Sequence, residues 1–174
     1  MKRRSLLRLG VLLPALIALA VAGMWLWVFL YHLGGDWLDN QPGRLPDATF
    51  ATAAEPVCQL AVDRFGRLPR AWETPTPDER AAVVQESVGI FAEMVADLRT
   101  VSFGNAPGPV EEWLLDWETY IADRADYGQR LTTDPAARFY VTQSDRDRRQ
   151  ITLAIDRFAQ TNGMPSCATP ADLS

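Results

Sequence analysis

The sequence is poor in the side chains that most often carry out covalent or proton-transfer chemistry. It contains one lysine, Lys2, and one histidine, His32, so neither residue type occurs after position 32. Catalytic arrangements that pair serine or cysteine with histidine, or serine with lysine, therefore cannot form in the rest of the chain. His32 follows a long apolar segment and is interpreted as an interfacial residue. These absences exclude the common nucleophilic hydrolases.

Cysteine is also scarce, with only Cys58 and Cys167 present. Two thiolates without histidine offer too few soft ligands for a zinc site. In an oxidising compartment an even number of cysteines indicates a disulfide, and the chain-entropy model assigns so long a closure about 4 to 5 kcal/mol. The alternative is two buried free thiols. We predict a Cys58–Cys167 disulfide and no metal or other cofactor.

Acidic residues are absent before Asp36, and residues 9–33 contain no Lys, Arg, Asp or Glu. A bilayer requires roughly 20 apolar residues, so 9–33 predicts a transmembrane signal-anchor helix. Residues 1–8 contain four basic residues, which favours a cytoplasmic N-terminus and an extracytoplasmic C-terminal domain.

The outer end of this segment carries Trp25, Trp27 and Tyr31, residue types that prefer the membrane interface. A cleaved signal peptide is the alternative, because Ala18-Leu19-Ala20 and Ala20-Val21-Ala22 resemble cleavage sites. Residues 34–46 are rich in Gly, Pro and Asn and predict a linker, which leaves 47–174 as the external domain.

The part after residue 33 contains 13 basic and 22 acidic residues, a formal charge of −9. Nucleic acid would be repelled by this surface. The expected partners are the membrane itself and an envelope protein or wall component.

Apolar periodicity in the external domain predicts an all-α fold, a bundle of about four helices closed by the disulfide. The first helix is expected from about Pro56 to Leu68. The second begins with the capping box Thr76-Pro77-Asp78-Glu79 and continues to Leu98. The turn 103–109 precedes a third helix that ends near Leu131. Its short connection predicts antiparallel packing.

The fourth helix is predicted to begin after Ser144, an N-cap residue type, and to end at Asn162-Gly163, with Pro165 beyond it. A short extended piece, 139–142, precedes it and is too short to imply a sheet.

The third helix carries a strip of aromatic and charged residues that forms a candidate interaction face: Trp113, Asp116, Tyr120, Asp123, Arg124 and Tyr127. Such residue types commonly anchor interfaces. Bundle packing with polar ends turned toward water is the alternative. Arg124 falls within the apolar stripe itself, so we expect it to reach solvent or to meet a carboxylate such as Glu93, Asp97 or Asp63.

Four features, in this order along the chain, are similar to those of uncharacterised single-pass envelope proteins of actinobacteria: the basic start with one span, Cys58, the segment DWETYIADRADY (116–127) and the ending NGMPSCATPAD (162–172). The resemblance covers architecture and two short segments. It implies a membrane-anchored envelope protein and transfers no functional residue.

Two functions remain open. The first is a non-enzymatic, membrane-anchored accessory protein that docks a partner through its external helices. The second is an envelope glycan- or small-ligand-binding domain with carboxylate-based hydrolase activity, for which the clustered acids of the third helix would serve: Glu111, Glu112, Asp116 and Glu118.

Overall fold

The computed structural model describes residues 19–28, 43–144 and 148–172, and these divide between two units, 1–42 and 43–174. In the first unit, residues 19–28 are helical. The rest of the predicted span 9–33, the basic segment 1–8 and the linker up to 42 lie outside the described residues. Among the described helices, none combines the length and the apolar character that crossing a membrane requires.

The second unit is all-helical, as predicted. Its elements are α3 (Thr49–Phe65), the short 3-10 helix η1 (Ala71–Glu73), α4 (Pro77–Thr100), α5 (Pro107–Leu131), α6 (Ile151–Thr161) and the 3-10 helix η2 (Pro165–Cys167). Within the described residues, extended pairing is limited to one antiparallel bridge between Gln143 and Gln150.

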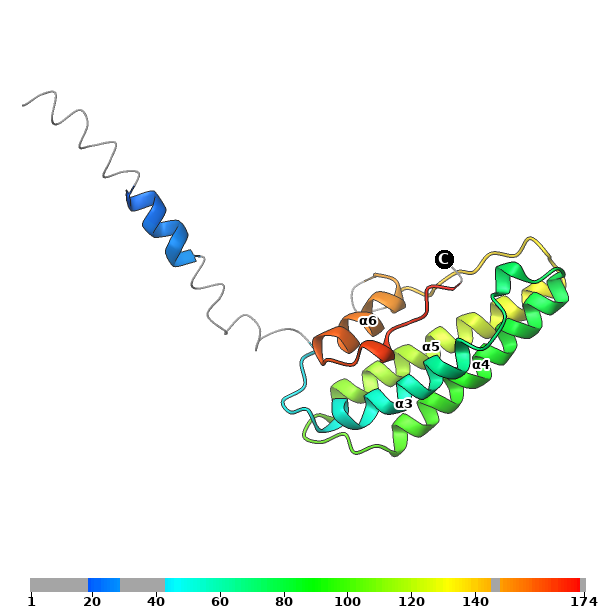
Figure 1. Cartoon of the computed structure of the whole chain (residues 1–174), viewed down its shortest axis with the longest axis horizontal. Helices are drawn as coiled ribbons and strands as arrows, with labels where there is room; N and C mark the ends of the chain where they lie inside the picture. The colour runs from blue at the N-terminus through cyan, green and yellow to red at the C-terminus, as the bar shows by residue number, and fades with distance from the viewer. Residues whose placement is uncertain (1–18, 29–42, 145–147, 173–174) are drawn as a thin grey trace, which may run out of the picture. The chain divides into compact units, whose positions relative to one another are not determined.

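Helices α4 and α5 form a long antiparallel hairpin at the centre of the unit (Figure 1). Helix α3 packs against α4, and α6 packs against α5. The element η2 contacts both α3 and α6, so it links the two outer helices. Gly128 allows α4 and α5 to approach closely, because a Cβ there would lie 3.2 Å from Val84 Cγ1 and 2.6 Å from Gln85 Nε2.

Helix α4 begins as its sequence predicts. Thr76 accepts a hydrogen bond from the Glu79 backbone, and the Glu79 side chain accepts one from the Thr76 N–H, which completes the capping box. Pro77 occupies the first turn, where no N–H is required.

Helix α3 differs from the prediction at both ends. It begins at Thr49, seven residues before Pro56, and ends at Phe65. Pro56 is therefore inside the helix, although proline removes a backbone donor there. The early start buries Phe50 and Ala54, and the Asp47 carboxylate accepts a hydrogen bond from the Thr49 N–H at 2.9 Å. Tertiary burial thus overrides the local proline signal.

Helix α6 begins at Ile151, so the prediction that Ser144 caps it is wrong. Ser144 is buried, its N–H donates to the Arg149 carbonyl, and its carbonyl accepts from the Arg148 N–H. The predicted end is confirmed. Gly163 has φ +71°, and bonds from Gly163 and Met164 back to α6 form a Schellman cap.

The predicted disulfide is present. Cys58 of α3 and Cys167 of η2 are bonded, their Cα atoms are 5.0 Å apart and both residues are fully buried. The bond ties the segment that follows α6 to α3.

Candidate functional site

The structure places most of the predicted interaction face inside the domain. Only Asp123 is more than slightly exposed, and five of the six residues are buried: Trp113, Asp116, Tyr120, Arg124 and Tyr127. Asp123 lies at the edge, where its carboxylate accepts bonds from the Thr142 N–H and hydroxyl, each at 2.7 Å.

The aromatic members of this face form the seam along which other segments cover α5. The Trp113 indole stacks on Phe158 of α6 with ring centroids 5.2 Å apart, and its N–H donates to the Ile155 carbonyl at 3.3 Å. The Tyr127 ring packs on Phe139 at 5.6 Å. These contacts favour the packing interpretation of the strip, since a partner would meet little of it in the folded domain.

Arg124 is the centre of a buried polar cluster. Its NH1 and NH2 groups donate to Asp172 Oδ1 and Oδ2, each at 2.9 Å, which is a bidentate ion pair. Its Nε and NH2 donate to Ser87 Oγ at 3.2 and 2.7 Å, and NH1 also donates to the Tyr120 hydroxyl at 3.0 Å. Ser87 Oγ in turn donates to the Val84 carbonyl, so its lone pairs face the guanidinium.

Aromatic rings complete the surroundings of this guanidinium. The Cζ atom of Arg124 is 5.3 Å from the Phe91 ring centroid and 5.7 Å from those of Phe65 and Tyr120. Such faces attract cations, more strongly where water is excluded. The Arg124 side chain is 1% exposed and that of Asp172 is 15% exposed.

The ionisation of the cluster follows from these contacts. Burial lowers the pKa of Arg124, but its bonds to Asp172 and Tyr120 outweigh burial and leave the pKa above the ordinary guanidinium value. Burial raises the pKa of Tyr120, and the Arg124 charge opposes that effect only in part. The cluster therefore holds a guanidinium cation beside a neutral phenol.

The partner of Arg124 is not among the residues the sequence singled out. Glu93 instead pairs with Arg64 at the surface. Asp172 lies in an irregular segment, where no periodicity marks an inward-facing residue. Ser87 was detectable, because it is a polar residue three and four positions from Val84 and Phe91 on the buried stripe of α4.

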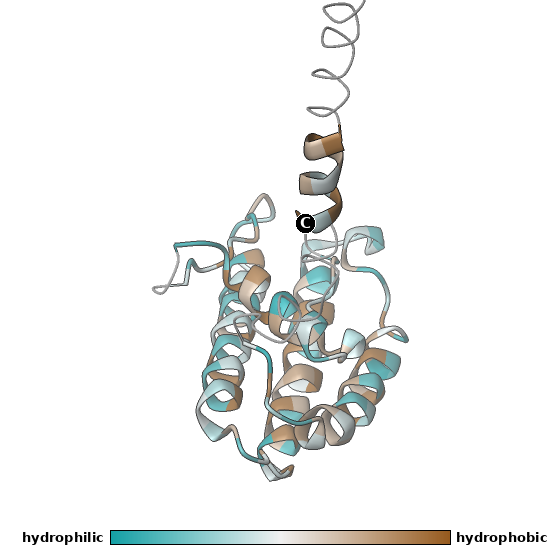
Figure 2. Cartoon of the chain, turned by 90° about the vertical axis from the view of Figure 1, so that its left-hand side faces the viewer, coloured by the Kyte–Doolittle hydropathy of each residue, from teal (hydrophilic) through white to brown (hydrophobic). Residues whose placement is uncertain are grey.

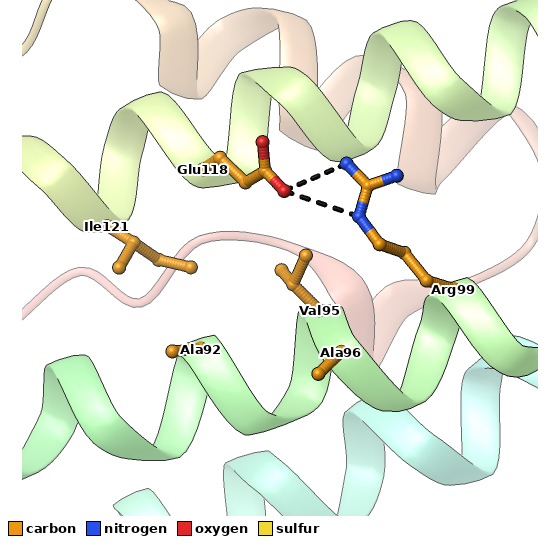
Figure 3. A pocket seen from close by; sticks show the side chains of 6 residues that line it. All are labelled: Ala92, Val95, Ala96, Arg99, Glu118 and Ile121. Carbon is orange, nitrogen blue, oxygen red and sulfur yellow. Dashed lines mark hydrogen bonds and ion pairs between the residues drawn. The ribbon is translucent and has the colours of Figure 1, made fainter.

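The outer surface of the α4–α5 hairpin contains a shallow groove of about 250 Å³ (Figure 3). Small and apolar side chains form its floor. Its lining consists of Ala92, Val95, Ala96, Arg99, Glu118 and Ile121. We call this feature the hairpin groove. Sequence reasoning missed it, because the apolar stripes were all assigned to the interior.

One end of the hairpin groove is closed by ion pairs. Arg99 reaches across from α4, where NH2 donates to Glu118 at 2.8 Å and NH1 donates to both Glu111 carboxylate oxygens at 2.7 and 2.9 Å. These bonds raise the pKa of Arg99. Two carboxylates share one cation, so this end retains a formal charge of −1.

The arrangement of the acids bears on the hydrolase hypothesis. Two facing carboxylates about 5 to 9 Å apart across an open cleft are needed for glycoside hydrolysis. Glu118 is the single acid that lines the hairpin groove, and Arg99 binds both it and Glu111. In addition, no three metal-ligating side chains cluster within the described ranges. The lining of the hairpin groove therefore does not contain two facing carboxylates.

Comparison with known protein families, with curated proteins and with solved structures gave no match to this chain.

Proposed function

We propose that the chain is a membrane-anchored accessory protein of the cell envelope, with its N-terminus cytoplasmic and its helical domain extracytoplasmic. The domain docks a partner helix in the hairpin groove. The observation that carries this proposal is a surface groove between α4 and α5 with alanine, valine and isoleucine side chains in its lining.

Two features support the anchor. The segment 9–33 lacks strongly charged residues, and the four basic residues that precede it favour retention on the cytoplasmic side. Helix 19–28 exposes apolar side chains around its circumference, Figure 2 colours much of it as hydrophobic, and Met24, Trp25 and Trp27 are each more than half exposed. A helix that is apolar on all sides requires apolar surroundings.

The disulfide supports the placement of the domain outside the cytoplasm. Protein disulfides persist in oxidising compartments and are rare where thiols are kept reduced. The Cys58–Cys167 bond also closes most of the domain sequence into one loop, with a separation of 109 residues.

The hairpin groove defines the chemistry of its partner. Ala92 and Ala96 leave room for another helix backbone to approach, while Val95 and Ile121 offer apolar contact. The surplus carboxylate at the Arg99 end, and the −9 charge of the part after residue 33, attract a positive partner. We therefore assign the groove to an amphipathic helix with small apolar residues and at least one Lys or Arg.

The docking test uses the full chain in mild detergent. Ala96→Arg fills the groove and repels a basic helix. Ala53→Arg is the matched control, because Ala53 is an exposed alanine on α3. We expect a stoichiometric partner with wild type and Ala53→Arg, and at least a tenfold loss with Ala96→Arg.

The identity of the contact gives a second readout. A photo-crosslinker at position 96 should label a basic amphipathic helix of that partner. Recovery of the chain alone, equal recovery with Ala96→Arg, or crosslinks to a non-helical or acidic segment would each contradict the proposal.

The anchor is tested separately by alkaline carbonate extraction of membranes. The full chain should remain in the membrane pellet. Release into the supernatant, or a mature N-terminus after Ala20 or Ala22, would overturn the anchor without affecting the groove.

A further inference from the structure

The buried Arg124 is bound by an irregular segment of the same chain. Residues 168–172, here called the strap, follow η2 and contribute Asp172 to the cluster. The strap is also bound through Thr169, whose N–H and hydroxyl donate to Asp156 at 2.7 and 3.0 Å. We propose that the Arg124 guanidinium and the groups around it form a carboxylate-binding site that Asp172 fills in cis and that accepts an aspartate or glutamate side chain of an acidic peptide when the strap is displaced.

The two halves of this ion pair are held very differently. Arg124 belongs to a long helix, and its other contacts also come from helices: Phe65 of α3, Ser87 and Phe91 of α4, and Tyr120 of α5. None of these groups is part of the strap. The receptor half is therefore preorganised by the helices.

The ligand half lies on a segment without regular structure. Every strap residue is partly or fully exposed, whereas the preceding Cys167 is buried. Thr169 and Asp172 bind the strap to the rest of the domain through Asp156 and Arg124. An exposed irregular segment with few buried contacts opens at lower free energy than the helices beneath it.

Displacement of the strap leaves the Arg124 guanidinium without its counter-ion, and binding of another anion would be favourable. A guanidinium that is buried without a counter-charge carries a large desolvation penalty. Its planar fork matches the two oxygens of a carboxylate. The aspartate side chain of Asp172 already makes such a bidentate contact with Arg124.

The charge of the surroundings selects a monoanion. Arg124 is the cation that binds Asp172, and the carboxylate of Asp156 binds Thr169 of the same strap. A dianionic phosphate would bring more negative charge than one guanidinium compensates. The site therefore favours a carboxylate over phosphate.

This inference does not depend on the membrane anchor or on the hairpin groove. It is tested with the full chain in detergent at pH 7 and constant ionic strength. Asp172→Ala vacates the carboxylate position. Thermal unfolding is followed in sodium chloride, acetate and phosphate, and with the amidated peptide Ala-Thr-Pro-Ala-Asp, whose Asn version is the control.

We expect acetate at about 0.1 M to raise the midpoint of Asp172→Ala by about 5 °C over chloride. Phosphate should raise it less, and wild type should respond equally to all three salts. The Asp peptide should act at lower concentration than acetate, and the Asn peptide should have no effect. If acetate acts and the Asp peptide does not, the site takes small acids and the peptide assignment fails.

The double variant Arg124→Met with Asp172→Ala removes both charges and should lose the acetate response. If Asp172→Ala is unfolded in chloride, folding on addition of acetate is the same readout. An acetate effect equal to that of chloride, a response that survives in the double variant, or a chain unfolded in every salt overturns the proposal.

Discussion

Two guanidinium groups of this domain bind carboxylates with similar geometry in different surroundings. Arg124 and Asp172 are joined by two bonds of 2.9 Å, and the Arg124 side chain is 1% exposed. Arg99 binds Glu111 and Glu118 at 2.7 and 2.8 Å, with its side chain 34% exposed. The distances barely differ, so surroundings decide what each pair contributes. A buried pair is costly to break, whereas an exposed pair contributes little and is screened by salt.

The two clusters also differ in how the chain holds them. Asp172 is five residues beyond Cys167, whereas Arg99, Glu111 and Glu118 lie on the hairpin itself. Removing the disulfide with Cys58→Ala and Cys167→Ala should lower the free energy of unfolding by about 4 kcal/mol. It should also loosen the Arg124 cluster and leave the Arg99 cluster unchanged. Denaturant unfolding under oxidising conditions measures the loss.

A double-mutant cycle checks this dependence. The cost of Asp172→Asn should decrease in the disulfide-free background, and the cost of Glu118→Gln should stay the same within about 0.3 kcal/mol. Equal costs of Asp172→Asn in both backgrounds would show that the strap is held without the disulfide.

The second prediction compares isosteric changes in the two clusters. Asp172→Asn leaves the Arg124 charge buried without an anion and should cost about 3 kcal/mol. This cost is at the lower end of the range for breaking a buried ion pair, because the Asp172 side chain is partly exposed. Chemical denaturation of the full chain in detergent measures it. A cost below about 1 kcal/mol, equal to that of an exposed pair, would remove the distinction between the clusters.

Features of this fold that depend on local sequence could be predicted, whereas features that depend on tertiary packing could not. The capping box at Thr76 and the Gly163 helix end are local signals, and both are confirmed. The disulfide followed from counting two cysteines. The start of α3 was predicted wrongly, because the burial of Phe50 in the finished bundle outweighs the local meaning of Pro56.

The functional clusters were harder to predict. The position of Arg124 on an apolar stripe predicted that it reaches solvent or meets a carboxylate. Nothing in the sequence identified Asp172, which is 48 residues away in an irregular segment. The hairpin groove depends on which face of α4 and α5 the outer helices leave uncovered. That face is a property of packing, and periodicity alone does not distinguish it from the core.

Tyr120 provides the third test, because its hydroxyl accepts a hydrogen bond from Arg124 in the buried cluster. Tyr120→Phe removes the acceptor of one Arg124 bond and should cost about 1 to 2 kcal/mol near neutral pH. The exposed Tyr140, changed to Phe, is the matched control. Equal effects of the two changes would mean that the phenol does not support the guanidinium.

The pH dependence of Tyr120 gives an independent check. Burial raises the pKa of Tyr120 in the folded state, so its hydroxyl holds the proton more tightly in the folded chain than in the unfolded chain. The stability it contributes is fully present below about pH 10, the ordinary value, and is lost as the pH rises through the folded pKa. Unfolding free energies measured from pH 8 to 11 should fall less steeply for Tyr120→Phe than for wild type.

The smallest expected effect belongs to the exposed cluster. Glu118→Gln removes one carboxylate from Arg99, which keeps its two bonds to Glu111, so the cost should not exceed about 1 kcal/mol. At 1 M salt the Debye length is about 3 Å, and this cost should nearly vanish, while that of Asp172→Asn persists. Denaturation curves of wild type and both variants at 0.1 and 1 M sodium chloride measure these costs. If both costs fall together with salt, water reaches Arg124 in solution, and the buried cluster is screened in the same way as the exposed one.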